Sequence, residues 1–434
     1  MQRHSLIFLS LACIAWLAAC GGGGGSGGGM PSNTATPTTA PTIGPQGVCN
    51  GSTASASSSG PAPVTPNGIS VPAGFAIQVI ANVGDARELA ALPNGDLLVA
   101  TNDTLYIVPN AESSGAAGAP VAFAHFNDTP AVGVTFVQSS CTIYVGAQHG
   151  IYEIPYHDGQ LSGTPVQIAS VRTGSISPTT DGDVHVTTSV AFAGGMLYAS
   201  VGSSCNSCTE VDPTRASIQV MNPNGSNMTT RATRIRNGIA LAVNPVTGTL
   251  WAGGAGQDSL PVGHPYEYFD PVSLHPGVAD YGWPQCEENQ VAYASGANCS
   301  STVVPRVEMK AYSTIIGAAF YPQNLHGSYA FPSSYAGGAF LAAHGSWHDP
   351  NAGGVPCASP AQVVFVAMNG DTPVTPVNWS DPTAQDQGFV TGFQTGCYAS
   401  NRIGRPTGVT IGAKGSLFVG DDQNGLIYRI RPGT

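Results

Sequence analysis

The sequence has 434 residues, only 9% of them charged, and its 14 Lys+Arg against 25 Asp+Glu give a formal net charge of −11. An acidic chain without a basic run cannot make the many phosphate contacts of nucleic-acid binding, so that class of function is excluded. The only lysines are Lys310 and Lys414. An arginine at a structured position is therefore informative.

Residues 1–20 are typical of a secretory signal, with a basic start and an apolar run over 6–19 that is too short to span a membrane as a helix. The ending Leu17-Ala18-Ala19-Cys20 resembles a bacterial lipobox, which predicts lipidation of Cys20. The alternative is an ordinary cleaved signal with an incidental cysteine. Because Gly21 follows, we expect a Gram-negative host to send the protein to the outer membrane, with the lipid anchor as its only membrane contact.

Residues 21–67 begin with GGGGGSGGG and continue as a run rich in Thr, Pro, Ser and Gly. A segment of this composition cannot bury a core and predicts a flexible tether. The folded domain is then expected to span residues 68–434.

Eight cysteines lie beyond Cys20, and an even number in an exported chain suggests disulfides. Pairing sequence neighbours gives Cys205 with Cys208, Cys286 with Cys299 and Cys357 with Cys397, and leaves Cys49 for Cys141. Connectivity cannot be deduced from sequence alone, so this pairing is one possibility among several.

The folded part contains short apolar, β-branched and aromatic runs separated by Gly, Pro, Asn and Asp, a pattern typical of an all-β protein. One phrase recurs: a strand, a turn, a second strand ending in small residues, and then a third strand. Its six copies span residues 88–108, 132–154, 187–220, 238–254, 315–367 and 406–430.

Each copy forms a small antiparallel sheet that cannot bury both faces alone, and stacking six such sheets radially predicts a six-bladed β-propeller. A pair of β-sandwich sheets or another β-solenoid is the alternative. The segment 75–80, FAIQVI, is suited to supply the outer strand of the last blade. The long gap 371–401, which lies near Cys357 and Cys397, is expected to cover the central funnel as a lid.

Polar residues precede the first strand of five copies, and equivalent positions of a propeller converge around its axis on one face. Like charges held together cost energy unless something anionic lies between them, and arginine suits bidentate contacts with carboxylate or phosphate. The sequence therefore predicts a compact polyanionic ligand, with His185 placed for proton transfer. The alternative is that each arginine pairs with a local carboxylate and joins blades. The residues are Arg87, His185, Arg236, Asn237, Lys310, Tyr312, Arg402 and Arg405.

Four motifs occur in an order that resembles the sorbosone dehydrogenase-like branch of the PQQ-dependent sugar dehydrogenases, relatives of soluble glucose dehydrogenase. They are RNGIALAVNPVTGTLWAGG at 236–254, YGWP at 281–284, HGSW at 344–347 and GRP at 404–406. The resemblance covers residues from about 71 onward. It implies a six-bladed propeller, pyrroloquinoline quinone (PQQ) held with Ca²⁺, and oxidation of an aldose or a related aldehyde or alcohol. It also implies a periplasmic electron acceptor, which the sequence does not identify.

The same resemblance implies the roles of individual residues. His185 would be the general base, Arg236 would polarise the quinone carbonyl, and Gln257 with Asp258 would lie at the calcium ion. The implied cofactor-binding set is Arg87, Arg236, Asn237, Gln257, His344, Ser346, Trp347, Arg402 and Arg405.

Three residues at two sites depart from the family pattern. His348 and Asp349 follow HGSW where the family usually has Asn and Arg, and Tyr312 stands where it often has His. These departures keep open a cofactor-free propeller that binds a glycan or a protein. A calcium-dependent lactonase-like hydrolase is less favoured, because it needs a ring of inward carboxylates where this chain has Arg and His.

Overall fold

The computed structural model describes residues 49, 59–173, 184–261, 263–346, 359–396 and 398–433. The predicted signal with Cys20, most of the tether, Trp347, Cys357 and Cys397 lie outside this part of the chain. Within it, no helix has the length and apolar character needed to cross a membrane. The described helices are short 3₁₀ turns at η1 (Val272–Leu274), η2 (Ser333–Tyr335) and η4 (Ala399–Asn401).

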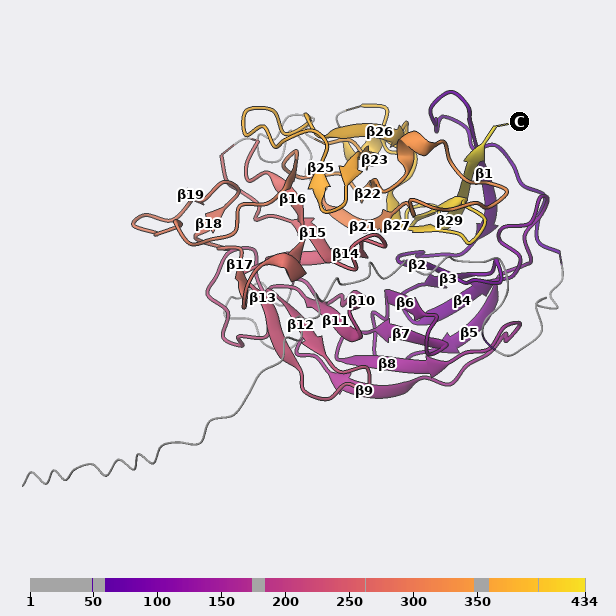
Figure 1. Cartoon of the computed structure of the whole chain (residues 1–434), viewed down its shortest axis with the longest axis horizontal. Coiled ribbons are helices and arrows are strands. Elements are labelled where there is room, and N and C mark those ends of the chain that lie inside the picture. Colours follow the sequence, from indigo (N-terminus) through magenta and orange to yellow (C-terminus); the bar gives the residue numbers. More distant parts are fainter. Residues whose placement is uncertain are drawn as a thin grey trace, which may run out of the picture. The chain divides into compact units, whose positions relative to one another are not determined.

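Six sheets of at least four strands surround a common axis, and each contains one copy of the repeated phrase (Figure 1). The predicted all-β, six-bladed propeller is confirmed. The first three blades are β2 (Leu89–Ala91), β3 (Leu97–Ala100), β4 (Thr104–Val108) and β5 (Val121–His125); β6 (Gly133–Val137), β7 (Thr142–Gly146), β8 (Gly150–Pro155) and β9 (Val166–Ser170); and β10 (Val190–Ala193), β11 (Met196–Val201), β12 (Ser217–Met221) and β13 (Thr229–Thr233), with β17 (Ala279–Asp280) added at the edge.

The last three blades complete the ring, and two short hairpins extend from it. The blades are β14 (Asn237–Val243), β15 (Leu250–Ala255), β16 (Glu267–Asp270) and β20 (Val307–Met309); β21 (Ile315–Phe320), β22 (Ala339–Ala343), β23 (Gln362–Val366) and β26 (Asp386–Val390); and β27 (Pro406–Ile411), β28 (Leu417–Asp421), β29 (Leu426–Pro432) and β1 (Phe75–Asn82). The hairpins are β18 (Cys286–Glu287) with β19 (Val291–Ala292), and β24 (Met368–Asn369) with β25 (Thr372–Pro373).

The ring closes through the N-terminal strand β1, which pairs antiparallel with β29 from Phe75 opposite Pro432 to Asn82 opposite Leu426. This is the closure predicted for the segment 75–80. Arg429 of β29 is fully buried and donates to the carbonyl oxygens of Ala111, Ser113 and Gly115, which follow β4 of the first blade. The first and last blades are therefore joined by buried side-chain bonds as well as by the β1–β29 pairing.

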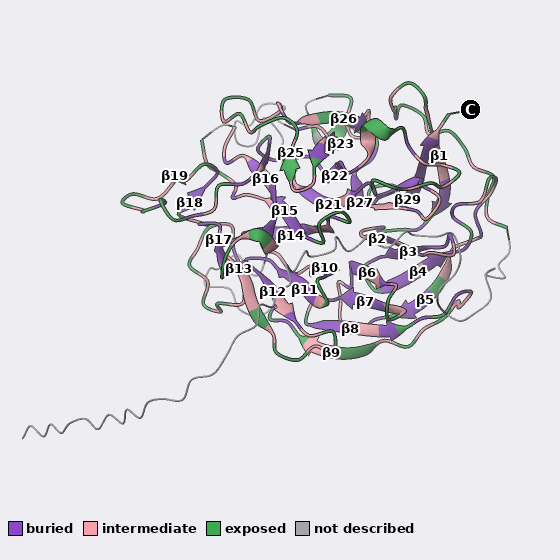
Figure 2. Cartoon of the chain, viewed as in Figure 1, coloured by how far each residue is buried: buried purple, intermediate pink, exposed green. Residues whose placement is uncertain are grey.

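The repeated sequence pattern predicted the inner strands of the blades better than the outermost strands. Buried residues dominate the inner strands, whereas every residue of β9 is at least partly exposed (Figure 2). A strand exposed on one face needs no strong apolar pattern, so its sequence signal is weak. The segment 371–401, expected to be a lid, supplies β26, the outermost strand of the fifth blade. That part of the lid expectation is wrong.

Three of the four suggested disulfides are present: Cys49 with Cys141, Cys205 with Cys208, and Cys286 with Cys299. The fourth involves Cys357 and Cys397, outside the described residues. Part of the segment assigned to the tether also touches the propeller, through isolated bridges of Ser59 with Gly118 and of Val64 with Val79.

A cavity of about 500 Å³ lies along the innermost strands of all six blades. Its lining reaches the residues that follow these strands, such as Pro245 and Pro322. The cavity therefore opens toward the face at which the innermost strands end. One apolar lining residue from each blade is Leu89, Phe136, Phe192, Leu241, Phe320 and Ile411.

Candidate active site

Antiparallel pairing brings two kinds of segment together on the other face of the propeller. Each innermost strand begins where its neighbouring second strand ends, as the pairings of Asn237 with Ala255 and of Pro406 with Asp421 show. Residues just before a first strand therefore meet residues just after a second strand. We call the face where these segments meet the polar face.

His185 lies on the polar face before β10, and its ring is held by the segment after β11. Nδ1 is 3.0 Å from the carbonyl oxygen of Ser203 and 2.9 Å from its Oγ. Ser203 Oγ donates its own proton to the carbonyl oxygen of Cys205, at 2.7 Å. Since a carbonyl oxygen only accepts, the proton of the neutral His185 ring is on Nδ1 and the basic lone pair is on Nε2.

The environment of His185 keeps its ring neutral. Desolvation by burial, followed by the nearby charge of Arg236, lowers the pKa of His185 well below its ordinary value of 6.5. Part of the residue's surface is nevertheless accessible. A neutral imidazole with a defined tautomer is one of the arrangements that a general base requires.

Buried Arg215 fixes the backbone that carries His185. Its Nη2 donates to the carbonyl oxygen of His185 at 3.1 Å, and its Nε donates to the carbonyl oxygen of Gly202 at 2.7 Å. A Cβ at Gly202 would lie 2.5 Å from His185 Cβ and 2.7 Å from Asn237 Oδ1. Glycine is required there because the backbone passes directly against both side chains.

Arg236 is almost fully buried beside this histidine. Its Nη2 donates to Asp258 Oδ2 and to Asn206 Oδ1, each at 2.9 Å, and its Nε donates to the carbonyl oxygen of Asn206 at 3.2 Å. Burial acts first, to lower the pKa of Arg236, and the Asp258 carboxylate opposes that shift. Arg236 therefore pairs with a local carboxylate, as the alternative interpretation of the sequence proposed for the arginines.

Asn237 contributes a buried acceptor with no hydrogen-bond partner among the described residues. Its side-chain oxygen Oδ1 is buried, and the residue is 9% exposed. Leaving such a group unsatisfied costs about 1–3 kcal/mol. A ligand that donates a hydrogen bond here would remove that cost.

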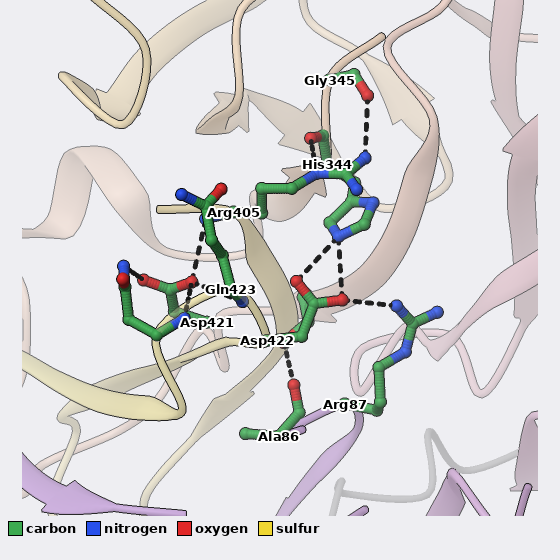
Figure 3. A network of polar contacts seen from close by, with 10 residues as sticks. Ala86, Arg87, His344, Gly345, Arg405, Asp421, Asp422 and Gln423 are labelled. Atoms are coloured by element: carbon green, nitrogen blue, oxygen red, sulfur yellow. Dashed lines mark hydrogen bonds and ion pairs between the residues drawn. The ribbon is translucent and has the colours of Figure 1, made fainter. Parts of the chain in front are cut away.

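A second polar network lies where the first, fifth and sixth blades meet (Figure 3). Asp422 accepts a bond from Arg87 Nη1 at 2.7 Å, and both of its oxygens lie 3.0 Å from His344 Nε2. Although burial acts to raise it, the hydrogen bond and charge of His344 together with Arg87 lower the pKa of Asp422 to about 2. An ionised carboxylate only accepts, so His344 Nε2 carries a proton.

Arg405 completes this network. Its Nε and Nη2 donate to the carbonyl oxygens of His344 and Gly345, each at 3.2 Å (Figure 3). Among the described residues no carboxylate forms an ion pair with Arg405. Burial, followed by the charge of Arg402, lowers the pKa of Arg405 to about 10. Arg402 itself donates to Gln394 Oε1 at 3.1 Å.

The predicted calcium ligands are engaged in other contacts. Asp258 pairs with Arg236, and its main-chain N and O both bond to the Asn206 side chain. Gln257 Nε2 donates to the carbonyl oxygen of Pro284 at 3.0 Å. Among the His, Cys, Asp and Glu side chains of the described residues, the group of three within reach of one ion is Cys205, Cys208 and Glu210, whose cysteines are disulfide-bonded. The contact of Gln257 is made by its amide nitrogen, which is not a metal ligand, so calcium at Gln257 and Asp258 stays a prediction.

The polar face thus collects the predicted residues into two groups. The first group joins His185, Arg236, Asn237 and Asp258, and the second joins Arg87, His344 and Arg405. Gln257 and Ser346 are buried on the same face after β15 and β22, and Trp347 lies outside the described residues. The segment between the groups contains Tyr312, which is buried with a positive φ of 64°.

Sequence reasoning missed several residues that follow second strands. The repeat pointed only to positions before first strands, and the residues after second strands that were named, such as Gln257, Asp258 and His344, came from the family resemblance. Antiparallel pairing places both kinds of position side by side. The same register, applied to the end of each second strand, would have predicted them. The main residues missed are Ser203, Asn206 and Asp422, together with Arg215 before β12.

Comparisons with known proteins agree with this architecture. A family model described as TrAA12-like matches residues 278–432. A curated but uncharacterized protein of Borreliella burgdorferi is 24% identical over 201 residues, which cover 45% of this chain and 47% of that protein. The chain therefore spans about half the length of the curated relative it matches.

Solved structures resemble the chain over most of its length. The carbohydrate-active enzyme of family AA12 from Trichoderma reesei gives a TM-score of 0.67 at 17% identity, covering 86% of this chain and 98% of that one. The PQQ domain of pyranose dehydrogenase from Coprinopsis cinerea, in its holo form, gives 0.67 at 15% identity, with coverage of 85% and 98%.

A PQQ-bound aldose sugar dehydrogenase from Streptomyces coelicolor gives a TM-score of 0.53 at 17% identity, with coverage of 83% and 99%. At these identities the similarity establishes a shared fold. The chain is thus similar in fold, across more than four-fifths of its length, to these three structures, two of which are named as PQQ-containing sugar dehydrogenases.

Proposed function

We propose that this chain is a PQQ-dependent oxidoreductase that acts on an aldose sugar or on a related aldehyde or alcohol. The observation that carries the proposal is His185, whose proton is held on Nδ1 by Ser203 and whose ring lies beside the buried cation of Arg236. The shared fold with proteins named as PQQ-binding sugar dehydrogenases supports the choice of cofactor.

His185 acts as the general base in this proposal. Nε2 accepts the proton of the hydroxyl group on the carbon that is oxidised, while the bond from Nδ1 to Ser203 holds the ring in place. A bound PQQ supplies the two-electron acceptor for the hydrogen of that carbon. Because the pKa of His185 is well below 6.5, the ring is neutral at pH 7 and can accept a proton, but the same low pKa makes Nε2 a weaker base than a histidine that titrates near pH 7.

Three features fit an anionic, planar cofactor. The guanidinium of Arg405 forms bonds to carbonyl oxygens and has no ion pair in the described part of the chain, so its charge is suited to a ligand carboxylate. The buried acceptor of Asn237 is suited to a ligand donor. Arg236 places a second cation on the same face, although Asp258 partly compensates it. Calcium at Gln257 and Asp258 stays part of the proposal, with Asp258 Oδ2 already paired with Arg236.

Reconstitution tests the proposal. The purified chain is titrated with PQQ in the absence and presence of Ca²⁺, and dye reduction is then measured across a panel of aldoses, aldehydes and alcohols. We expect saturable PQQ binding and substrate-dependent dye reduction. No binding under either condition would overturn the proposal.

A cofactor-free binding propeller is the second candidate. The ion pairs of Arg87 with Asp422 and of Arg236 with Asp258 favour it, because they compensate two predicted cofactor cations within the protein. A glycan array and a protein pull-down with the same preparation would support this candidate if PQQ does not bind. The lactonase-like alternative is weaker, since Asp258 and Asp422 both pair with arginines and do not form a ring around a metal site.

We further propose that the protein is exported and anchored through a lipid on Cys20, on the sequence pattern alone. Mass spectrometry of the mature N-terminus tests this. A diacylglyceryl group on Cys20 is expected, and a mature chain that begins after Cys20 would contradict the proposal.

A further inference from the structure

The four-residue loop 205–208 contacts Arg236 directly and His185 through Ser203. The disulfide between Cys205 and Cys208 closes it. Cys205 is buried against Ala216 and Trp283, whereas Cys208 is partly exposed. One end of the loop is therefore fixed in the core and the other lies near the surface.

Asn206 in this loop binds Arg236 at two points. Its carbonyl oxygen accepts from Arg236 Nε at 3.2 Å, and its side-chain Oδ1 accepts from Arg236 Nη2 at 2.9 Å. Contacts with both Nε and Nη2 fix the plane of the guanidinium as well as its position. Asn206 thus determines how the cation is oriented.

The side chain of Asn206 also holds the partner of that cation. Oδ1 accepts from the main-chain N of Asp258 at 2.8 Å, and Nδ2 donates to its main-chain O at 3.1 Å. The carbonyl oxygen of Asn206 accepts from Trp283 Nε1 at 3.1 Å, which ties the loop to the core. Both members of the Arg236–Asp258 ion pair are therefore positioned by one asparagine.

The start of the same loop reaches His185. The carbonyl oxygen of Cys205 accepts a hydrogen bond from Ser203 Oγ at 2.7 Å. Because the proton of Ser203 Oγ points there, Ser203 Oγ is an acceptor toward His185 Nδ1. Ser203 N also donates to the carbonyl oxygen of Arg236 at 2.7 Å. A shift of Cys205 would consequently disturb the tautomer of the base as well as the strand that carries the cation.

We propose that the disulfide-closed loop 205–208 is a positioning device for the reacting pair, in which Asn206 orients Arg236 and Asp258 and the bond between Cys205 and Cys208 holds Asn206 in place. The chemical role of His185 and Arg236 in this inference rests on the proposed function. The contacts by which the loop positions them do not. Asn206 is a positioning residue, since it acts through Arg236.

Two variants of the full chain test the role of the loop. Cys205→Ser/Cys208→Ser removes the bond that closes it, and Asn206→Ala removes the side-chain contacts but keeps the disulfide. We expect each variant to lower turnover about 10- to 10²-fold, as a small misplacement of reacting groups does. Asn206→Asp keeps the acceptors for Arg236 but replaces the donor to Asp258 with a charged oxygen that faces the Asp258 main-chain oxygen, so it should recover only part of the activity.

The matched control is Cys49→Ser/Cys141→Ser, which removes a disulfide in the second blade. That bond closes a much longer loop, with a sequence separation of 92 against 3, so its loss should lower thermal stability more. Turnover of the control should stay within about a factor of 2 of the unchanged protein, because it leaves the contacts around His185 in place.

A measurement on the protein without cofactor separates this inference from the proposed function. The solvent exchange of the Arg236 Nε–H hydrogen, followed by NMR, reports the bond to the Asn206 carbonyl. We expect exchange at least about tenfold faster in Cys205→Ser/Cys208→Ser and unchanged exchange in the control, whether or not PQQ binds. Unchanged exchange in the loop variant, or equal acceleration in the control, would overturn the inference; absence of PQQ binding alone would not.

Discussion

The two histidines of the polar face have opposite hydrogen-bond assignments. His185 carries its proton on Nδ1, toward the Ser203 carbonyl oxygen, and keeps a lone pair on Nε2. His344 carries a proton on Nε2, which it donates to Asp422. Burial lowers the pKa of both rings, that of His344 to about 4. The partner of each ring, rather than its burial, therefore decides which histidine is suited to be a base.

The largest expected effect comes from removing the base. His185→Ala should lower turnover about 10²- to 10⁴-fold, the usual contribution of a positioned general base, with little change in PQQ affinity. Steady-state kinetics and PQQ titration on the same preparation measure both quantities.

His344→Ala is the matched control for that variant. It removes the other buried histidine of the polar face but leaves Ser203 and the tautomer of His185 unchanged. A larger loss of turnover in His344→Ala than in His185→Ala would reverse the assignment of roles.

Arg236→Lys should have the next largest effect. Lysine keeps the positive charge, but an ammonium group cannot reproduce the flat fork that now binds Asp258 and Asn206 together. We expect turnover to fall about 10- to 10²-fold while the protein remains folded. The comparison variant is Arg234→Lys. Arg234 forms an ion pair with Asp280, so this variant shows whether replacing an arginine by lysine at another ion pair has the same effect.

How much of the fold and the site could be predicted from the sequence differs between positions before first strands and positions after second strands. The repeat fixed the blade number and the closure by residues 75–80, because buried strands with small residues at their ends recur with a recognisable phrase. It also placed His185 and Arg236 at equivalent positions. Asp422 and Asn206 follow second strands, and their partners lie in other segments, so only the folded register reveals that Asp422 compensates Arg87 and that Asn206 orients Arg236.

Asp422→Asn should affect stability more than the chemistry. It removes the carboxylate between Arg87 and His344, and charge-assisted hydrogen bonds contribute about 1.5–3 kcal/mol. We expect the free energy of unfolding at pH 7 to fall by about 2 kcal/mol, measured by urea denaturation.

The pH dependence gives a second signature of Asp422. Its pKa is about 2 in the folded protein and 3.8 ordinarily, so the unfolded chain binds the proton more tightly. The stabilisation is present above pH 3.8 and is lost as the pH falls toward 2. Asp422→Asn should lack this acid-side loss, and an acid profile identical to that of the unchanged protein would contradict the pKa assignment.

The smallest effect on turnover is expected at Glu88, the residue after Arg87, which lines the channel cavity and forms no ion pair with an arginine in the described part of the chain. Its oxygens accept from Ser189 Oγ and from Val134 N, yet desolvation by burial raises its pKa from 4.5 to about 8. The folded protein therefore binds this proton more tightly than the unfolded chain, so stability falls as the pH rises from 4.5 to 8. Glu88→Gln stays neutral and should remove most of that fall, up to roughly 3 kcal/mol between pH 5 and pH 8, measured by urea denaturation at the two pH values. The direction is opposite to that for Asp422, whose carboxylate is paired with Arg87. An unchanged slope in Glu88→Gln would mean that Glu88 is ionised in the channel, and that a carboxylate on these innermost strands needs no cationic partner to remain charged.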